Sequence, residues 1–132
     1  MKIALATVMV DDQDKALRFY TEGLGFKRMA DLPFPGYRWL TVVSPEVPDS
    51  IELVLEPTST EAARTFQKAL YDAATPMVAF LSSDIHTEYA RLKERGVVFR
   101  GEPTIEGPIT TVLFEDGCGN LIHLFQPNQP RP

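Results

Sequence analysis

Two side chains in strand-like segments could take part in acid–base chemistry, Glu52 and His123. Each alternates with apolar neighbours, Glu52 with Leu53 and His123 with Ile122, so each should project from the polar side of a half-buried strand. If both reach one cleft, His123 is a candidate catalytic acid or base, and Glu52 its orienting partner or the base itself. An equally good interpretation is a buried structural pair, in which the two side chains only bind each other and catalyse nothing. Both interpretations stay open.

An internal repeat provides the elements that must position these two residues. The segment 6–12, followed by 16–20 and 23–26, matches the segment 78–84, followed by 88–92 and 96–99. The spacing is nearly constant, because Asp84 follows Asp12 by 72 positions (84 − 12) and Gly96 follows Gly23 by 73 (96 − 23). A repeated segment of this length predicts a duplicated supersecondary unit.

Each copy has the pattern of a strand, a helix and three further strands. Asp12 and Asp84 are suited to cap the helices, and Gly23 or Gly25 and Gly96 to end them. The later strands are expected at about 27–30, 37–44 and 50–56, and at 99–101, 109–115 and 121–126. A linking helix is expected from Thr60 to Ala74. Its predicted apolar stripe consists of Ala62, Phe66, Ala69 and Leu70.

The pattern predicts an α+β fold of two tandem βαβββ modules that form a curved mixed sheet around a cleft. We expect one domain over 1–132, with the first module at about 1–57, the linking helix at 58–75 and the second module at 76–127. Residues 128–132 are expected to form an unstructured tail, which begins to fray at Pro127. The 33–36 segment is expected to be a plain hairpin connection, with a lid as the alternative.

Composition narrows the classes of partner. The 132 residues carry a formal net charge of -5, which argues against nucleic-acid binding and against attraction to an anionic membrane. The start of the chain lacks the apolar run of a signal peptide, and no stretch is long and apolar enough to span a membrane. With a single cysteine, Cys118, the sequence predicts a cytoplasmic protein.

Taken together, these motifs resemble the vicinal oxygen chelate superfamily, which includes glyoxalase I, the bleomycin and fosfomycin resistance proteins and the extradiol dioxygenases. The resemblance rests on 10–12 through 19–20 and 24–26, on 51–53, on 84 through 96–99, and on 119–124, so that it spans about 1–127. It implies a cup formed by two βαβββ modules, often completed in a homodimer. We therefore expect a homodimer.

The resemblance also implies four positions that hold a divalent metal in many members. Here they correspond to Leu5, Glu52, Met77 and His123, with spacings of 72 (77 − 5) and 71 (123 − 52). Leucine has no ligand atom and a thioether matches hard divalent ions poorly, so only Glu52 and His123 are candidate metal ligands. Two ligands are too few for a tightly held zinc. The sequence favours no metal cofactor, with weak binding of a divalent metal as the alternative.

Strand parity and the resemblance together predict further residues that contact a small-molecule ligand. They are Thr7, Trp39, Thr41, Met77, Ala79 and Thr111, with Arg38 as a candidate contact for a carboxylate or phosphate or, equally, an exposed charge on an edge. For Trp39, packing in the core is the favoured alternative, because tryptophan is usually well buried. Two functions follow. One is a glyoxalase/bleomycin resistance/dioxygenase-like protein that binds a small molecule in the cleft with a depleted metal site. The other is a metal-dependent lyase, isomerase or dioxygenase that uses Glu52 and His123.

Overall fold

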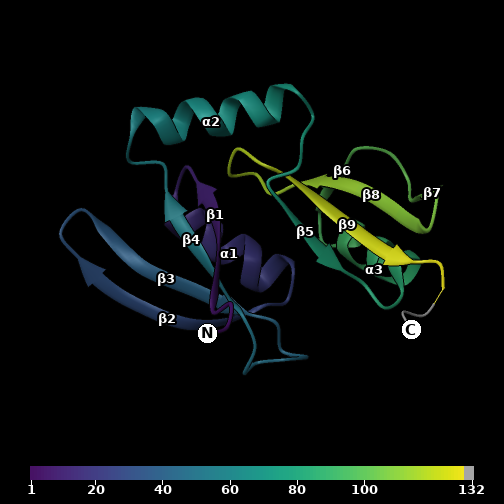
Figure 1. Ribbon diagram of the computed structural model, residues 1–132, viewed down its shortest axis with the longest axis horizontal. Helices are drawn as coiled ribbons and strands as arrows, with labels where there is room; N and C mark the ends of the chain where they lie inside the picture. Colours follow the sequence, from purple (N-terminus) through teal and green to yellow (C-terminus); the bar gives the residue numbers. More distant parts are fainter. Residues whose placement is uncertain (130–132) are drawn as a thin grey trace.

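The computed structural model describes residues 1–129 of the chain and confirms an α+β fold (Figure 1). The first unit comprises β1 (Leu5–Val10), α1 (Gln13–Arg18), β2 (Lys27–Phe34), β3 (Tyr37–Val43) and β4 (Glu52–Pro57). The second comprises β5 (Val78–Leu81), α3 (Ile85–Glu94), β6 (Val98–Phe99), β7 (Thr104–Glu106), β8 (Ile109–Glu115) and β9 (Leu121–Pro127). The linking helix is α2 (Glu61–Asp72), which crosses the top of the molecule in Figure 1.

Each unit builds its own sheet, and the strand order repeats. The first sheet has the order β1-β4-β3-β2 and the second β5-β9-β8-β6, with β7 paired to β8. In both sheets the first strand of the unit runs parallel to the last, and the other pairs are antiparallel. Equivalent elements of the two sequence repeats therefore occupy equivalent places in the two sheets.

Side-chain caps fix where the helices begin. Asp12 accepts a hydrogen bond from the Lys15 amide at 3.0 Å, and Asp84 accepts one from the Thr87 amide at 3.2 Å. The backbone donor of Lys15 holds the pKa of the Asp12 carboxyl below its usual range. α1 continues into a π-helical turn, η1 (Phe19–Gly23), and the chain then turns at Gly25 with φ 90°.

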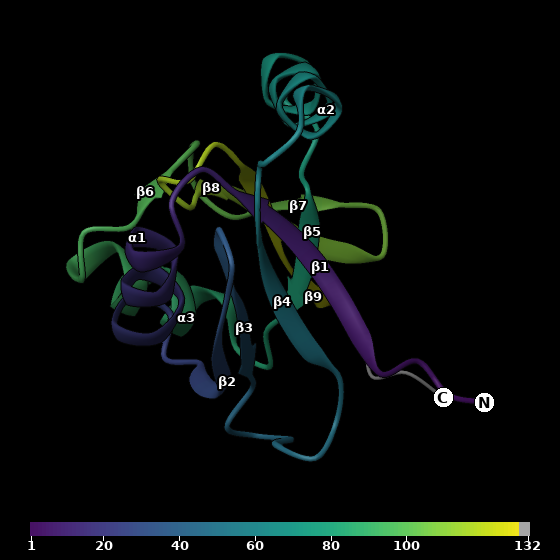
Figure 2. The same ribbon diagram turned by 90° about the vertical axis from the view of Figure 1, so that its left-hand side faces the viewer.

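The helix sides of the two sheets share one core. α1 lies on β4 and α3 on β9, and in Figure 2 both helices lie on the same side of the molecule, α1 in front of α3. Aromatic rings connect the units, because Phe80 of β5 meets Phe26 at a centroid distance of 5.0 Å and Tyr20 at 6.5 Å. The core also contains Val8, Val10, Leu40, Leu55, Val112, Phe114, Ile122 and Leu124. Each fully buried side chain of this size contributes roughly 1.5–3 kcal/mol.

The prediction for the linking helix was right about its place and wrong about its face. Thr60 caps α2 as expected, accepting from the Ala63 amide at 3.1 Å. Phe66, expected to be buried, is 53% exposed, whereas Gln67 is 8% exposed. The reason is a set of hydrogen bonds made by the Gln67 amide, described below, which turns the polar position inward and leaves the predicted apolar stripe outward.

Three strands of the structure differ from the expected limits: β2, β6 (Val98–Phe99 instead of 99–101) and β7. β2 runs to Phe34 and so includes Pro33, which an edge strand tolerates because one side of its backbone needs no partner. β7 was not predicted. The 33–36 segment connects β2 and β3 as a plain hairpin, with Phe34 opposite Tyr37. Asn128, placed in the expected tail, donates its backbone N–H to Pro108 at 2.8 Å; residues 130–132 lie outside the described range.

Candidate functional site

The candidate site residues lie mainly on the side of each sheet that faces away from the helices, which we call the outer face. In the first sheet, alternation along the strands places Leu5, Thr7, Trp39, Thr41 and Glu52 there, opposite the buried set of Val8, Leu40 and Leu53. In the second sheet it places Ala79, Thr111, His123 and Phe125 there, opposite Val112, Ile122 and Leu124. Most of the residues predicted to contact a ligand thus gather on the outer faces.

Glu52 is held by a threonine on the neighbouring strand. Thr41 of β3 donates its hydroxyl proton to Glu52 Oε1 at 2.6 Å. The same hydroxyl oxygen accepts the backbone N–H of Ala30 at 3.1 Å, where the β2–β3 register shifts. Because Thr41 is fully buried, this chain of hydrogen bonds fixes the carboxylate against the sheet.

His123 is held in the same way. Thr111 of β8 is hydrogen-bonded to His123 Nε2, and Thr111 is itself buried. The imidazole also lies 5.5 Å, centroid to centroid, from the ring of Phe125 on the same outer face. The two outer faces therefore carry the same device, an acid or an imidazole anchored by a buried threonine.

The sequence contains a signal for this pairing of a polar residue with a threonine. Thr111 follows Thr41 by 70 positions (111 − 41), close to the spacing of 71 (123 − 52) between Glu52 and His123. Repeat spacing alone could thus have paired each polar residue with its threonine. Thr41 and Thr111 were predicted only as ligand contacts, whereas the structure shows that each holds a neighbouring side chain in place.

The expected direct pair between Glu52 and His123 is not formed within residues 1–129. Each side chain instead bonds to a threonine of its own sheet. In the same residues, no group of three or more His, Cys, Asp or Glu side chains lies close enough to hold a metal ion. The residues present in one chain therefore do not fit a tightly held divalent metal.

The other two implied metal positions also differ from the family pattern. Leu5 lies directly opposite Glu52 and is 45% exposed, so an apolar side chain occupies the place of a donor. Met77 precedes β5 and packs against the shared core. The residue opposite His123 is Ala79 instead of Met77, because the backbone N–H of Met77 already bonds to Leu121.

Trp39 lies half-buried on the outer face of the β2–β3 hairpin. Its neighbours toward the hairpin tip are Phe34 and Tyr37, whose rings stack at 5.3 Å with an angle of 13°. The observed register of β3 with β4 covers two pairs, and its continuation would place Arg38 opposite Pro57 (41 + 54 = 38 + 57 = 95). Proline has no backbone N–H to donate there.

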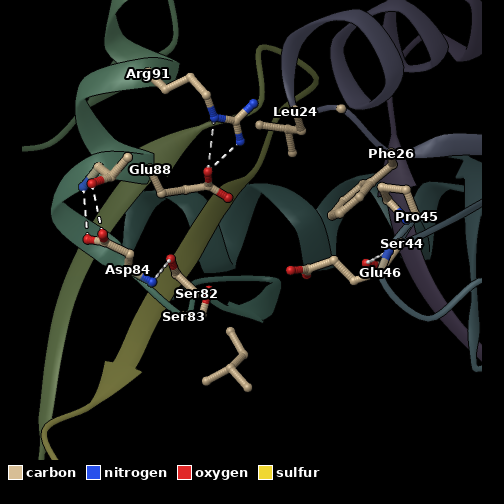
Figure 3. Close-up of a pocket in the computed structure, with 13 residues that line it drawn as sticks. Leu24, Phe26, Ser44, Pro45, Glu46, Ser82, Ser83, Asp84, Glu88 and Arg91 are labelled. Atoms are coloured by element: carbon tan, nitrogen blue, oxygen red, sulfur yellow. Dashed lines mark hydrogen bonds and ion pairs between the residues drawn. The ribbon is translucent and has the colours of Figure 1, made fainter.

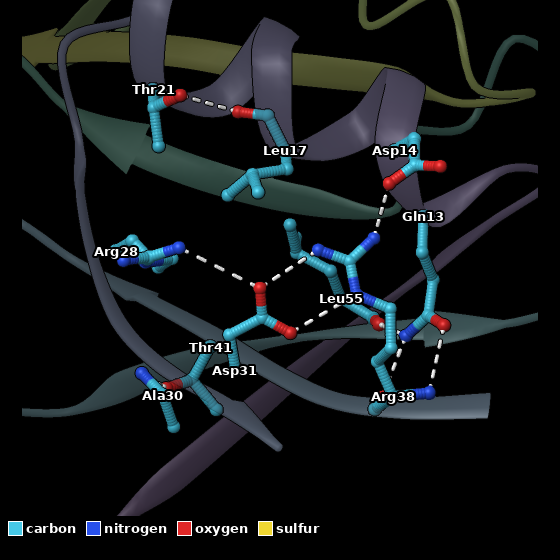
Figure 4. A network of polar contacts seen from close by, with 10 residues as sticks. All are labelled: Gln13, Asp14, Leu17, Thr21, Arg28, Ala30, Asp31, Arg38, Thr41 and Leu55. Atoms are coloured by element: carbon cyan, nitrogen blue, oxygen red, sulfur yellow. Dashed lines mark hydrogen bonds and ion pairs between the residues drawn. The ribbon is translucent and has the colours of Figure 1, made fainter. Parts of the chain in front are cut away.

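At this point the Gln13 side chain forms the hydrogen bonds that connect the two strands (Figure 4). Its Nε2 donates to the carbonyl oxygens of Arg38 at 2.7 Å and of Leu55 at 2.9 Å, and its Oε1 accepts the Arg38 N–H at 3.1 Å. One amide thus links β3 and β4 where their backbones no longer pair. It fixes the strand segment that carries Trp39.

Arg38 is on the other side of the sheet from Trp39 and Thr41. Its guanidinium donates to both carboxylate oxygens of Asp31, at 3.0 and 2.9 Å, and forms an ion pair with Asp14 (Figure 4). This pairing holds the pKa of the Asp31 carboxyl below its usual range. Arg38 therefore ties the hairpin to α1, and the structure does not bring it to the outer face with the other candidate residues.

The outer faces also expose apolar side chains. Leu32, Phe34 and Tyr37 are exposed on the β2–β3 hairpin and Leu81 on β5. Clusters of exposed apolar residues commonly mark a surface that another molecule covers. Within residues 1–129, the three α-helices are all too short or too polar to cross a bilayer.

Comparison with known proteins gives consistent matches over nearly the whole chain. Residues 2–124 match the model of the Glyoxalase/Bleomycin resistance protein/Dioxygenase superfamily. The uncharacterized protein YurT of Bacillus subtilis (strain 168) is 48% identical over 126 residues, covering 96% of this chain and 99% of the relative.

Solved structures agree with this match. The crystal structure of UcmS2 superposes with a TM-score of 0.82 at 30% identity, over 95% of this chain and 97% of that one. TnmS3, an antibiotic binding protein from Streptomyces sp. CB03234, superposes with a TM-score of 0.74 at 31% identity, over 97% of both chains. The chain belongs to the glyoxalase/bleomycin resistance protein/dioxygenase superfamily.

Proposed function

We propose that this protein binds a drug-sized, largely aromatic small molecule on its outer faces as a homodimer, without a tightly held metal. The single observation that carries the proposal is the state of the metal positions. Glu52 and His123 are each anchored to a threonine, and Leu5 and Ala79 lie opposite them. The surrounding surface is apolar and aromatic, which is typical of small-molecule sites.

The residues have distinct roles in this proposal. Trp39 and Phe125 provide flat apolar contacts, and Thr7 and Ala79 line the floor. Thr41 and Thr111 lie buried beneath it and hold Glu52 and His123 in place. Glu52 and His123 recognise polar groups of the ligand instead of holding a metal, and Met77 supports β5 from the core side. The similarity to an antibiotic binding protein supports this class of ligand.

A second copy of the chain completes the site in our proposal. The exposed apolar side chains of the outer faces would be covered by pairing, which symmetric homodimers achieve with one self-complementary surface. Sedimentation velocity should give a dimer of the 14.8 kDa chain at micromolar concentration. A monomer at that concentration would contradict this part of the proposal. The proposed compartment is the cytoplasm, since Cys118 is a buried free thiol.

Trp39 makes the binding test direct, because it is the only tryptophan in the chain. We expect saturable quenching of its fluorescence by members of a panel of polycyclic aromatic antibiotics, with micromolar dissociation constants. Phe125→Ala should weaken binding about tenfold through lost stacking. Phe66→Ala, on the exposed side of α2, should leave it unchanged. A panel without saturable quenching would count against the proposal.

Metal titration separates this proposal from a metal-dependent lyase, isomerase or dioxygenase. With Ni, Mn, Fe(II) and Zn added to the purified protein, we expect no micromolar binding that depends on the outer faces. Micromolar binding that disappears in both Glu52→Ala and His123→Ala would overturn the proposal and favour the enzyme.

A further inference from the structure

A cavity of about 380 Å³ lies between the two units and shares only Leu81 with the outer faces (Figure 3). The first unit contributes Leu24, Phe26 and the β3–β4 connection at 44–46. The second contributes the end of β5 and the start of α3, with Ser82 and Glu88. We call the place where residues 81–84 face residues 44–46 the open junction.

The internal repeat provides a second junction for comparison. By the spacing of 72 residues, Met9 corresponds to Leu81 (81 − 9) and Asp12 to Asp84 (84 − 12). Residues 9–12 face the β8–β9 turn at 116–120, and we call this the closed junction. There the Gln67 amide donates to Met9 O at 2.9 Å, Cys118 O at 3.1 Å and Asn120 Oδ1 at 3.1 Å.

One residue difference helps to explain why the other junction stays open. At the closed junction, Tyr20 reaches from η1 and donates its hydroxyl to Asp116 at 2.6 Å. By the repeat spacing, the equivalent residue of the second unit is Leu92 (92 − 20 = 72), which has no hydroxyl with which to bind the β3–β4 connection. The fold therefore repeats the junction, but its side chains fill only one copy.

The cavity combines apolar walls with negative charge. Leu24, Phe26 and Pro45 form part of its lining. Figure 3 shows the side chains of Glu46 and Glu88 extending from opposite units into the gap, and Arg91 pairs with Glu88 through Nε at 3.1 Å.

Asp84 adds a further carboxylate to the lining. It remains ionised because hydrogen bonds from Thr87 hold its pKa below the usual range. Arg91 is engaged by Glu88, and both oxygens of Asp84 accept hydrogen bonds from Thr87 at the start of α3. Among residues 1–129, Glu46 forms no ion pair, so its charge is left to attract a cation.

The serines at the two walls add hydrogen-bonding capacity. Ser82 accepts the backbone N–H of Asp84 at 3.1 Å, and Ser44 accepts that of Glu46 at 3.3 Å. A hydroxyl that accepts one such bond still has its own proton to donate. A ligand with a polar group near its cationic end fits this arrangement better than a hydrocarbon alone.

We propose that the open junction is a second small-molecule site, which binds an organic ammonium ion with an apolar body of about one aromatic ring. The ring lies against Leu24, Phe26 and Pro45, and the ammonium group lies beside the Glu46 carboxylate, on the side of the cavity away from the positive end of the α3 dipole. This site goes beyond the outer-face function, because it uses different residues and a different ligand chemistry.

The test is a titration of ¹⁵N-labelled protein with 2-phenylethylammonium chloride, followed by amide chemical shifts. We expect saturable shifts centred on Gly25, Glu46 and Ser83. Glu46→Gln should weaken binding about threefold, the size expected for loss of one exposed charge contact. Glu102→Gln removes a carboxylate outside the cavity lining and serves as the matched control, with unchanged binding expected.

Several outcomes would overturn the proposal. They are shifts that do not saturate, equal binding of the neutral analogue 2-phenylethanol, or equal weakening by Glu46→Gln and Glu102→Gln. The indole signal of Trp39 reports the outer face in the same spectra. Shifts centred on that signal would also overturn the second site.

Discussion

The closed and open junctions are two copies of one structural element that have reached opposite states. At the closed junction, Asp116 and Cys118 are at most 1% exposed, and buried hydrogen bonds join α2, η1 and the β8–β9 turn. At the open junction, Ser83 and Asp84 remain exposed beside a cavity. A duplicated fold can thus close one copy of a junction with buried hydrogen bonds and leave the other copy open to solvent.

Gly119 provides the strongest test of the closed junction. Its φ is 99°, and a Cβ atom at this position would lie 2.8 Å from the Gln67 side-chain amide. Gly119→Ala should therefore lower the free energy of unfolding by about 3 kcal/mol, through backbone strain and displaced buried hydrogen bonds. Urea unfolding measures the change.

Gly117→Ala is the matched control for this substitution. Gly117 also has a positive φ, 70°, but a Cβ there meets nothing within 4 Å, so we expect a loss of only about 1 kcal/mol. Equal losses in the two variants would show that close packing against Gln67 does not stabilise the closed junction.

Gln67→Ala compares the two junctions directly. Removal of its amide leaves buried acceptors of the closed junction without their donor, so the free energy of unfolding should fall by about 2 kcal/mol. At the open junction, Glu46→Ala should change it by less than about 0.5 kcal/mol, because Glu46 is exposed. Thermal unfolding of both variants measures the two changes in the free energy of unfolding. Similar changes in the two variants would contradict the prediction.

The smallest effect should appear only in alkaline solution. Burial raises the pKa of the Cys118 thiol to about 12, above the value of about 8.5 for a free thiol. The unfolded chain then releases its proton at lower pH than the folded chain, so Cys118 should stabilise the fold fully below pH about 8.5 and progressively less up to about 12.

Unfolding experiments from pH 7 to pH 11 can isolate this contribution. Cys118→Ala should lose less stability across that range than the parent protein, whatever its stability at neutral pH. Burial also raises the pKa of Tyr20. Both proteins should therefore still lose some free energy of unfolding at high pH, because Tyr20 is present in each. Identical pH profiles would indicate that the thiol is not protected as the closed junction requires.

Much of the fold could be predicted from the sequence because its determinants are local. Asp12, Thr60 and Asp84 each cap a helix through a residue three positions ahead. Alternation along short strands also placed Glu52 and His123 on the polar side of their sheets. The same alternation puts Arg38 on the opposite side of the sheet from Trp39. The sequence could therefore have excluded Arg38 from the face that carries the other candidate residues.

Other features depend on contacts between residues distant in sequence. The inward turn of Gln67 depends on acceptors 51 and 58 positions away, and no pattern within α2 indicates them. The separation of Glu52 from His123 depends on how the two units pack through Tyr20, Phe26 and Phe80. Repeat spacing predicts that the units resemble each other and leaves their relative placement undetermined.

The short pairing of β3 with β4 makes the two outer faces mechanically unequal. His123 sits in a β8–β9 ladder of seven residue pairs, whereas the hairpin that carries Trp39 is joined to β4 through two pairs and the Gln13 amide. Amide exchange should accordingly be faster near Trp39 than near His123. A ligand held between these faces would meet one wall that keeps its shape and one that can swing to accommodate molecules of different thickness.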